Sequence, residues 1–166
     1  MAWRGSTTVS DRIFACLVYL LPLLDLITLV GRPLILTQSF LSPVLRVIAI
    51  PLSPLLAVYG SLGGIVSFIV FFALFLLVVR NESIAHFIRF NTMQAILFGI
   101  VLSLVGLIWG YVLAPILGSS LFLTQTLFNT IFLGMIAAVG FSVIQSALGK
   151  YAEIPTISEA VYMQVR

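Results

Sequence analysis

The stretch LLAVYGSLGGIVSFIVFFALFLLVV, residues 55–79, carries no charged side chain from end to end. A second uncharged stretch, MQAILFGIVLSLVGLIWGYVLAPIL, occupies residues 93–117. A helix needs about 20 mainly apolar residues to cross the roughly 30 Å hydrocarbon core of a bilayer. Both stretches exceed that length, so they predict two transmembrane helices and an integral membrane protein.

Two further stretches predict two more spans. Residues 13–30 are mainly apolar, although they include Pro22 and Asp25. Residues 122–148 begin with a polar turn and become apolar after Ile131. We therefore expect an all-α membrane protein, a single membrane domain over residues 1–166, with four transmembrane helices and short interfacial elements.

The segment between the first two predicted spans, residues 31–54, is rich in proline. It contains two basic residues and four prolines, namely Arg32, Arg46, Pro33, Pro43, Pro51 and Pro54. Proline removes a backbone donor and interrupts regular helix, and lipid cannot satisfy the backbone groups that such a break frees. We therefore expect an interfacial or partly re-entrant element around residues 41–50 rather than a fifth crossing.

The composition also restricts the class of function. The chain is 61% hydrophobic and 8% charged, against roughly 45–50% and 25% in soluble domains. The net charge of +3 is scattered, so no nucleic-acid partner is expected. The motifs of phosphate-binding loops, zinc proteases and serine hydrolases are missing, and the single Cys16 and single His86 form no metal-ligand pattern. We predict no catalytic, cofactor-binding or metal-binding residue, and a protein that is not an enzyme.

The basic residues predict an orientation. With four spans and an inner N-terminus, residues 80–92 form an inner loop and residues 149–166 an inner tail. Six basic residues then lie inside and two, Arg32 and Arg46, lie outside; the six are Arg4, Arg12, Arg80, Arg89, Lys150 and Arg166. The positive-inside rule therefore places both termini on the cytoplasmic or stromal side.

Pairs of glycines recur at four-residue spacing within the spans. Gly60 and Gly64 form one GxxxG pair, and Gly106 and Gly110 form another. Such pairs let helix backbones approach closely in lipid. They predict either packing within one four-helix bundle or contacts with other subunits.

One acidic residue lies inside a predicted span. Asp25 is such a carboxylate, and carboxylates within the membrane are costly and often functional. Alternatively, Asp25 lies near the outer end of its helix and pairs with Arg32 or Arg46. His86, the single histidine, is expected to have a hydrogen-bonding or surface role on the inner side.

Two short stretches carry a family resemblance. They are HFIRFNTMQAIL, residues 86–97, and YAEIPTISEAVYMQV, residues 151–165. Together with four apolar spans they resemble the Tic20 (Tic-twenty) family, the twenty-kilodalton membrane subunit of the translocon at the inner envelope of chloroplasts. The resemblance covers the chain roughly from Ser10 to Val165. Because no transit peptide precedes it, the chain resembles a cyanobacterial or plastid-encoded member.

This resemblance implies a four-helix protein with both termini on the stromal or cytoplasmic side. It implies a part in importing preproteins, with other membrane subunits of the translocon as partners. It transfers no catalytic residue. The residues that match the two motifs are candidates for structural or partner contacts: Arg89, Asn91, Gln94, Glu153, Pro155, Glu159 and Tyr162.

Three functional hypotheses remain open at this point. A translocon subunit is expected to place Asp25, Gln125, Asn129 and Thr130 along one polar groove. A structural accessory subunit of another membrane complex, such as a photosynthetic assembly, would use its GxxxG faces. A small transporter would depend on Asp25. The tail after residue 149 either lies loosely on the membrane surface or docks onto a partner.

Overall fold

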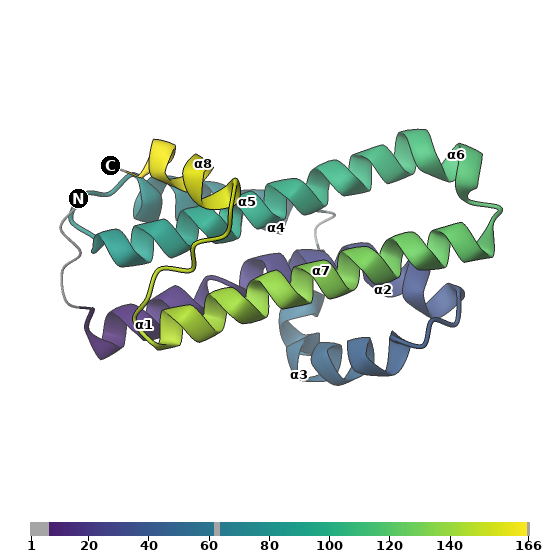
Figure 1. Cartoon of the computed structure of the whole chain (residues 1–166), viewed down its shortest axis with the longest axis horizontal. Helices are drawn as coiled ribbons and strands as arrows, with labels where there is room; N and C mark the ends of the chain where they lie inside the picture. The colour runs from purple at the N-terminus through teal and green to yellow at the C-terminus, as the bar shows by residue number, and fades with distance from the viewer. Residues whose placement is uncertain (1–6, 62–63, 166) are drawn as a thin grey trace.

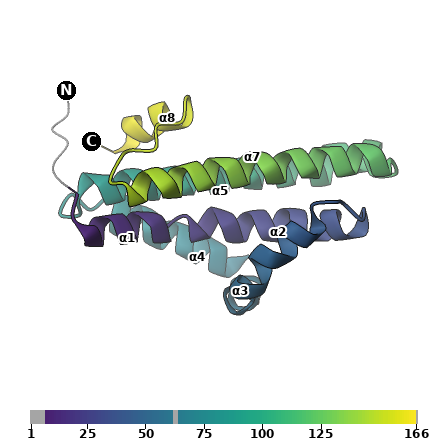
Figure 2. The same cartoon turned by 60° about the horizontal axis from the view of Figure 1, so that its bottom comes forward.

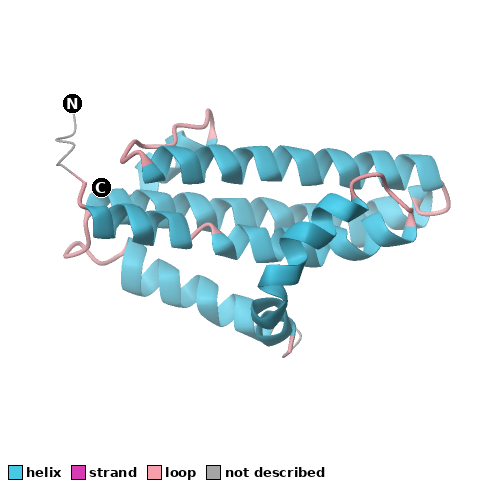
Figure 3. Ribbon diagram, turned by 90° about the horizontal axis from the view of Figure 1, so that it is seen from below, coloured by secondary structure: helices cyan, strands magenta, loops and turns pink. Residues whose placement is uncertain are grey.

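The computed structural model describes residues 7–61 and 64–165. Within these ranges all regular structure is helical, and Figure 3 shows helices joined by short loops. Four helical stretches are long and apolar enough to cross a membrane: Val9–Leu36, Ser42–Gly60, His86–Leu117 and Leu121–Ala147. The predicted class, an all-α membrane protein with four candidate spans, is confirmed.

The first candidate span consists of two helices. Helix α1 covers Val9–Leu17 and α2 covers Leu20–Leu36. The interruption follows from Pro22, which has no N–H to donate to the carbonyl of Val18. The backbone N–H of Leu21 donates to Val18 instead, at 3.2 Å. The helix axis nevertheless continues, so the interruption is only local (Figure 2).

Helix α3, Ser42–Gly60, contains the second half of the proline-rich segment, and the interfacial or partly re-entrant placement expected around residues 41–50 stays a prediction. Pro43 lies in the first turn, where a missing N–H costs nothing. Pro51 and Pro54 lie inside the helix, and α3 bends along its length in Figure 1 rather than ending there. The proline-rich segment is thus largely helical, and Pro33 likewise lies inside α2.

The stretch that suggested a membrane protein most strongly, residues 55–79, is not one helix. Helix α3 ends at Gly60, and α4, Ile65–Ala73, begins after Gly64, whose φ is 91°. This left-handed conformation is one that glycine adopts readily and other residues avoid. A π-helical segment, η1 (Leu74–Val79), extends α4. The uniform apolar composition of residues 55–79 therefore gave no sign that the chain changes direction between α3 and α4.

The second half of the chain follows the prediction more closely. Helix α5 covers His86–Ile108, so it begins within the stretch expected to be a loop, residues 80–92. It continues through π-helical η2 (Trp109–Leu113) into α6 (Ala114–Leu117), which contains Pro115. Helix α7 covers Leu121–Ala147, and a short helix, α8 (Ile157–Gln164), lies in the tail.

Helix α2 is central to the arrangement. It packs against α5, α7 and α3, while α1 packs against α5 and α7. Figures 1 and 2 show α1–α2, α4, α5 and α7 running roughly along one axis, with α3 oblique to them. The start of α1, the turn before α5 and helix α8 lie at one end of the bundle. The main apolar core contains α2, α5 and α7 side chains, including Leu26, Val30, Leu102, Phe128 and Phe132.

Of the glycines in the predicted GxxxG pairs, Gly106 packs closely against another helix. A Cβ atom on Gly106 would lie 3.2 Å from Cδ1 of Leu29 on α2. A Cβ on Gly60, Gly64 or Gly110 would meet nothing within 4 Å. Gly106 therefore supports packing within the bundle, whereas the other three do not have that role.

This difference predicts unequal effects of the same substitution. Gly106→Leu should lower the free energy of unfolding by about 1–3 kcal/mol, because the added side chain overpacks the α2–α5 contact. Gly110→Leu, on the same helical stretch, should change it by less than about 0.5 kcal/mol. Thermal unfolding in detergent measures both. Equal destabilisation by the two variants would contradict the assigned packing.

Candidate functional site

Buried polar side chains gather where α1, α5 and α7 meet near the end of the bundle that holds α8. We call this group the polar cluster. Its members come from the turn between α1 and α2, from α5 and from α7, and they are Tyr19, Asn91, Gln94, Ser142 and Ser146. Two of them, Asn91 and Gln94, belong to the first motif stretch.

Asn91 is the centre of the polar cluster. Its side chain is 0% exposed, and its Oδ1 accepts hydrogen bonds from the hydroxyls of Tyr19 at 2.8 Å and Ser146 at 2.7 Å. Its Nδ2 donates to the backbone carbonyl of Phe87 at 2.8 Å. One amide on α5 thus joins the α1–α2 turn to α7, and both lone pairs of its oxygen are used.

Gln94 joins the polar cluster to the tail. Its Nε2 donates to the backbone carbonyl of Ala152 at 3.0 Å and lies 3.5 Å from the hydroxyl of Ser142. Both Gln94 and Ala152 are fully buried. The first motif stretch therefore holds the second one in place by a hydrogen bond to its backbone.

Two further residues of the first motif stretch, Arg89 and His86, contact groups outside the polar cluster. Arg89 is 7% exposed, and its Nε donates to the carbonyl of Val79 at 2.9 Å. Val79 is the last residue of η1, where carbonyls lack partners within the helix. His86 lies with its Nδ1 3.0 Å from the hydroxyl of Tyr151 in the tail.

The tail packs on its own bundle. Val161 and Val165 are buried against Phe90, Met93 and Ile96 of α5. The tail therefore does not lie loose but packs on α5 of the same chain, and its docking onto a partner stays a prediction.

The four candidates from the second motif stretch lie on the outer side of the tail. Tyr162 donates to Oε1 of Glu153 at 3.1 Å, and the carbonyl of Pro155 accepts from the backbone N–H of Ile157. Glu153, Pro155, Glu159 and Tyr162 are all exposed. None of the four enters the polar cluster.

A second polar feature lies around Asp25, further along α2. Oδ1 of Asp25 accepts a hydrogen bond from the hydroxyl of Tyr59 on α3 at 2.5 Å. Its other oxygen, Oδ2, faces Gly99 on α5, where a Cβ would lie only 2.9 Å away. The expected pairing of Asp25 with Arg32 or Arg46 is therefore wrong, because Tyr59 of helix α3 is the hydrogen-bond partner of Asp25.

Asp25 and Tyr59 line a cavity of about 360 Å³ between α2, α3, α4 and α5. We call it the Asp25 cavity. Two serines add hydroxyls to an otherwise mainly apolar wall, and the lining residues are Leu21, Asp25, Tyr59, Gly64, Ser67, Phe68, Phe71, Ile96, Gly99, Ile100, Ser103 and Leu104. The Asp25 cavity therefore adjoins the interruption between α3 and α4.

Asn129 and Thr130 make other contacts than the groove expected for them with Asp25 and Gln125. Asn129 accepts a hydrogen bond from the hydroxyl of Ser39, in the α2–α3 turn, at 2.6 Å. Thr130 donates to a backbone carbonyl of its own helix, α7. Of the four residues assigned to that groove, Asp25 alone lines the Asp25 cavity. The polar start of α7 instead serves to hold the α2–α3 turn.

The described residues offer little for a metal or cofactor. Within residues 7–61 and 64–165, no three His, Cys, Asp or Glu side chains gather as possible metal ligands. Cys16 donates to the carbonyl of Val143 at 3.6 Å. The polar cluster holds helices and the tail in place. The region around Asp25 presents one carboxylate and nearby hydroxyls inside the bundle.

These features define a class: a multi-pass helical membrane protein whose C-terminal tail is held on the bundle by buried polar side chains. Comparison with known proteins makes this more specific. The family model described as "Chloroplast import apparatus Tic20-like" matches residues 9–161. The chain belongs to the Tic20 family, whose members are multi-pass proteins of cyanobacterial or chloroplast membranes.

Several relatives are similar along most of their length. A "Tic20 family protein" of Synechocystis sp. is 51% identical over 166 residues, covering 100% of this chain and 99% of the relative. A "Tic20 family protein Ycf60" of Gracilaria tenuistipitata var. liui is 34% identical, covering 95% and 76%. "Protein TIC 20-II, chloroplastic" of Arabidopsis thaliana is 29% identical, covering 96% and 74%. The family is not one of enzymes, in agreement with the sequence-based prediction.

The central place of Asn91 predicts a large effect of its removal. Asn91→Ala leaves the hydroxyls of Tyr19 and Ser146 buried without their acceptor, which should cost about 1–3 kcal/mol of unfolding free energy. Thr126→Ala, at an exposed position on α7, should cost no more than about 0.5 kcal/mol. Thermal unfolding in detergent compares the two, and similar melting temperatures would count against a stabilising role of Asn91.

The Asp25–Tyr59 hydrogen bond predicts an energetic coupling. In a double-mutant cycle, Asp25→Ala and Tyr59→Phe should show an interaction free energy of about 1 kcal/mol, as expected for a hydrogen bond between membrane helices. The control cycle pairs Asp25→Ala with Tyr111→Phe, since Tyr111 is exposed, and its effects should be additive. Additivity in both cycles would show that the pair contributes nothing to stability.

Proposed function

We propose that the chain is a membrane subunit of a protein translocation assembly, which helps to move preproteins across the chloroplast inner envelope or an equivalent cyanobacterial membrane. The observation that carries this proposal is the match of residues 9–161 to the family model described as a chloroplast import apparatus. The relatives named TIC 20-II and TIC 20-v, which are chloroplast proteins, support it.

The proposed role requires partner subunits. The Asp25 cavity measures about 360 Å³, which is the size of a small-molecule pocket rather than of a path for a polypeptide. The helices around it pack on a continuous apolar core. We therefore place the path for a preprotein at an interface between this chain and other membrane subunits of the translocon.

We place that interface beside the Asp25 cavity, whose lining includes the exposed Phe68, Ser103 and Leu104, so that the client contacts the cavity from outside the bundle. An extended polypeptide in a membrane exposes backbone N–H and C=O groups that lipid cannot satisfy. The Asp25 carboxylate accepts hydrogen bonds, and the hydroxyls of Tyr59, Ser67 and Ser103 donate as well as accept them. Groups of this kind could bind successive segments of different sequence, which a subunit that handles many preproteins needs.

We further propose that both termini lie on the cytoplasmic or stromal side. The start of α1 and helix α8 lie at one end of the bundle, with the turn between η1 and α5 (Figure 1). Arg12, Arg80, Arg89 and Lys150 belong to this end, while Arg32 lies near the opposite end of α2. The positive-inside rule then supports the orientation expected from the sequence.

Site-specific photocrosslinking tests the client contact. A photoreactive residue at Ser67 or Ser103, which line the Asp25 cavity, should form adducts with a preprotein arrested during import. The matched control is Leu133, an exposed residue on α7, where no adduct is expected. Adducts at neither serine, or equal adducts at all three positions, would refute this contact.

Partner identification tests the assembly itself. Purification from native membranes in mild detergent, followed by mass spectrometry, should recover translocation components together with this chain. Recovery of photosynthetic subunits alone would favour the structural accessory subunit. The transporter hypothesis has less support, because Asp25 is the one acidic residue among the described residues that line its cavity.

A further inference from the structure

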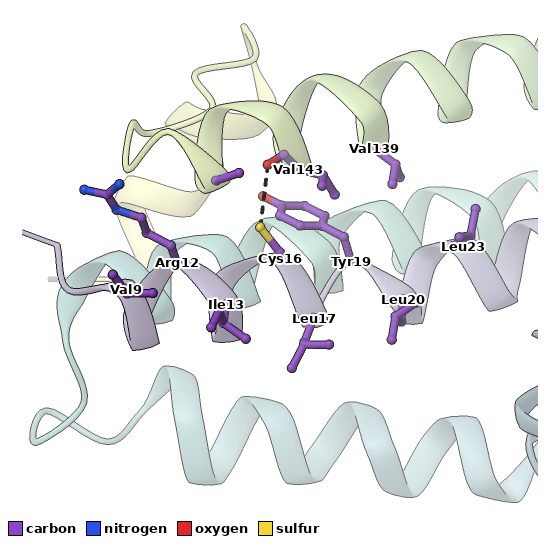
Figure 4. Close-up of a pocket in the computed structure, with 11 residues that line it drawn as sticks. Val9, Arg12, Ile13, Cys16, Leu17, Tyr19, Leu20, Leu23, Val139 and Val143 are labelled. Atoms are coloured by element: carbon purple, nitrogen blue, oxygen red, sulfur yellow. Dashed lines mark hydrogen bonds between the residues drawn. The ribbon is translucent and has the colours of Figure 1, made fainter.

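An apolar groove runs along the outside of the bundle between α1–α2 and α7. Its volume is about 530 Å³, which lies in the range of small-molecule sites. Figure 4 shows its lining side chains following one face of α1 and the start of α2, with α7 on the other side. The lining is aliphatic for most of its length, and Cys16 is hydrogen-bonded there to the carbonyl of Val143.

The length of this groove fits one leaflet of a bilayer. Its lining extends along α1–α2 from Val9 to Leu23, a difference of 14 positions (23 minus 9), and along α7 from Val139 to Ala147, a difference of 8 (147 minus 139). At 1.5 Å per residue these lengths are about 21 Å and about 12 Å, on either side of half of a 30 Å hydrocarbon core. A groove for a partner helix that crosses the membrane would be expected to continue through both leaflets.

Among the described residues, Arg12 is the one charged residue that lines the groove, and it lies at the end that holds the start of α1. Its Nε donates to the hydroxyl of Thr7 at 3.3 Å. Its guanidinium lies against Gly149, where a Cβ would be 2.9 Å from Nε and 3.1 Å from Cζ. Arg12 is therefore held at the mouth of the groove, and the exposed Lys150 follows Gly149 directly.

The one nearby acid on α1 has a local partner. The carboxylate of Asp11 accepts a hydrogen bond from the backbone N–H of Thr8 at 2.8 Å, in the capping box that begins α1. A positively charged group at the interface end of an apolar groove suits a lipid with an acidic headgroup, since basic pockets between membrane helices bind such headgroups.

We propose that this groove binds one acyl chain of an anionic bilayer lipid and that Arg12 binds its acidic headgroup. The lipid belongs to the leaflet on the side of the termini. Two observations identify this occupant. The positive charge of Arg12 complements an acidic headgroup, and the groove has about the length of one leaflet. The site is independent of the proposed function in translocation, because it lies on a different face from the Asp25 cavity.

Native mass spectrometry tests the proposal on the full-length protein. The detergent-purified chain is offered equal amounts of phosphatidylglycerol and phosphatidylcholine with identical acyl chains. Phosphatidylglycerol adducts should exceed phosphatidylcholine adducts roughly fivefold, the ratio that one basic side chain near a membrane surface contributes. Arg12→Gln should abolish this preference, and Arg12→Lys should keep it.

Two further variants complete the test. Arg46→Gln removes an exposed positive charge on α3 and should leave the preference unchanged. Ala147→Trp fills the groove from an exposed position and should reduce adducts of both lipids, with an unchanged melting temperature showing that the fold is intact. Three results would overturn the proposal. The unmodified protein could bind the two lipids equally, Arg12→Gln and Arg46→Gln could reduce the preference for phosphatidylglycerol equally, or the protein could form a lipid-free dimer through this face.

Discussion

The amide of Asn91 satisfies a constraint that membrane proteins face more severely than soluble ones, because a buried polar group has no water to bind. Its oxygen accepts from Tyr19 and Ser146, and its nitrogen donates to Phe87. The position of the α1–α2 turn against α5 and α7 depends on these bonds, and Gln94 extends them to the tail. Asn91 and Gln94 of the first motif stretch thus hold together parts of the same chain.

The end of the bundle around Asn91 and the region around Asp25 are built differently. Asn91 is fully buried, and its partners come from helices that also share apolar contacts. Asp25 has its hydrogen bond from Tyr59 on α3, a helix that is oblique and followed by an interruption at Gly64 (Figure 2). Elements with fewer packed neighbours open at lower free energy than the rest of a fold. Local opening of the bundle therefore costs less free energy around Asp25 than around Asn91.

The fold was predictable where one physical signal dominated. Apolar length alone identified the helices that became α5 and α7, because lipid requires continuous backbone hydrogen bonding. It failed for residues 55–79, where composition is uniform and the left-handed Gly64 decides the geometry. The rule that proline interrupts a helix failed for α3, because breaks were expected there and the structure has a helix. Pro43 lies where a helix needs no donor, and Pro51 and Pro54 bend the helix without ending it.

The polar sites were predictable only in part, because a sequence shows which groups need partners but not which partners they find. Asp25 was recognisable as a costly group, yet nearby arginines were the obvious candidates and Tyr59, 34 positions away, is the actual one. Tyr19 and Tyr59 both carried a usable signal: a phenol hydroxyl lies too far from its own backbone to bond it, so inside an apolar segment it needs a partner from another part of the chain. Serine and threonine hydroxyls carry less information, because Thr130 bonds a carbonyl of its own helix, whereas Ser39 in a turn bonds Asn129. The sequence therefore indicates that the two tyrosines have distant partners, and the fold decides that Tyr19 bonds Asn91 and Tyr59 bonds Asp25.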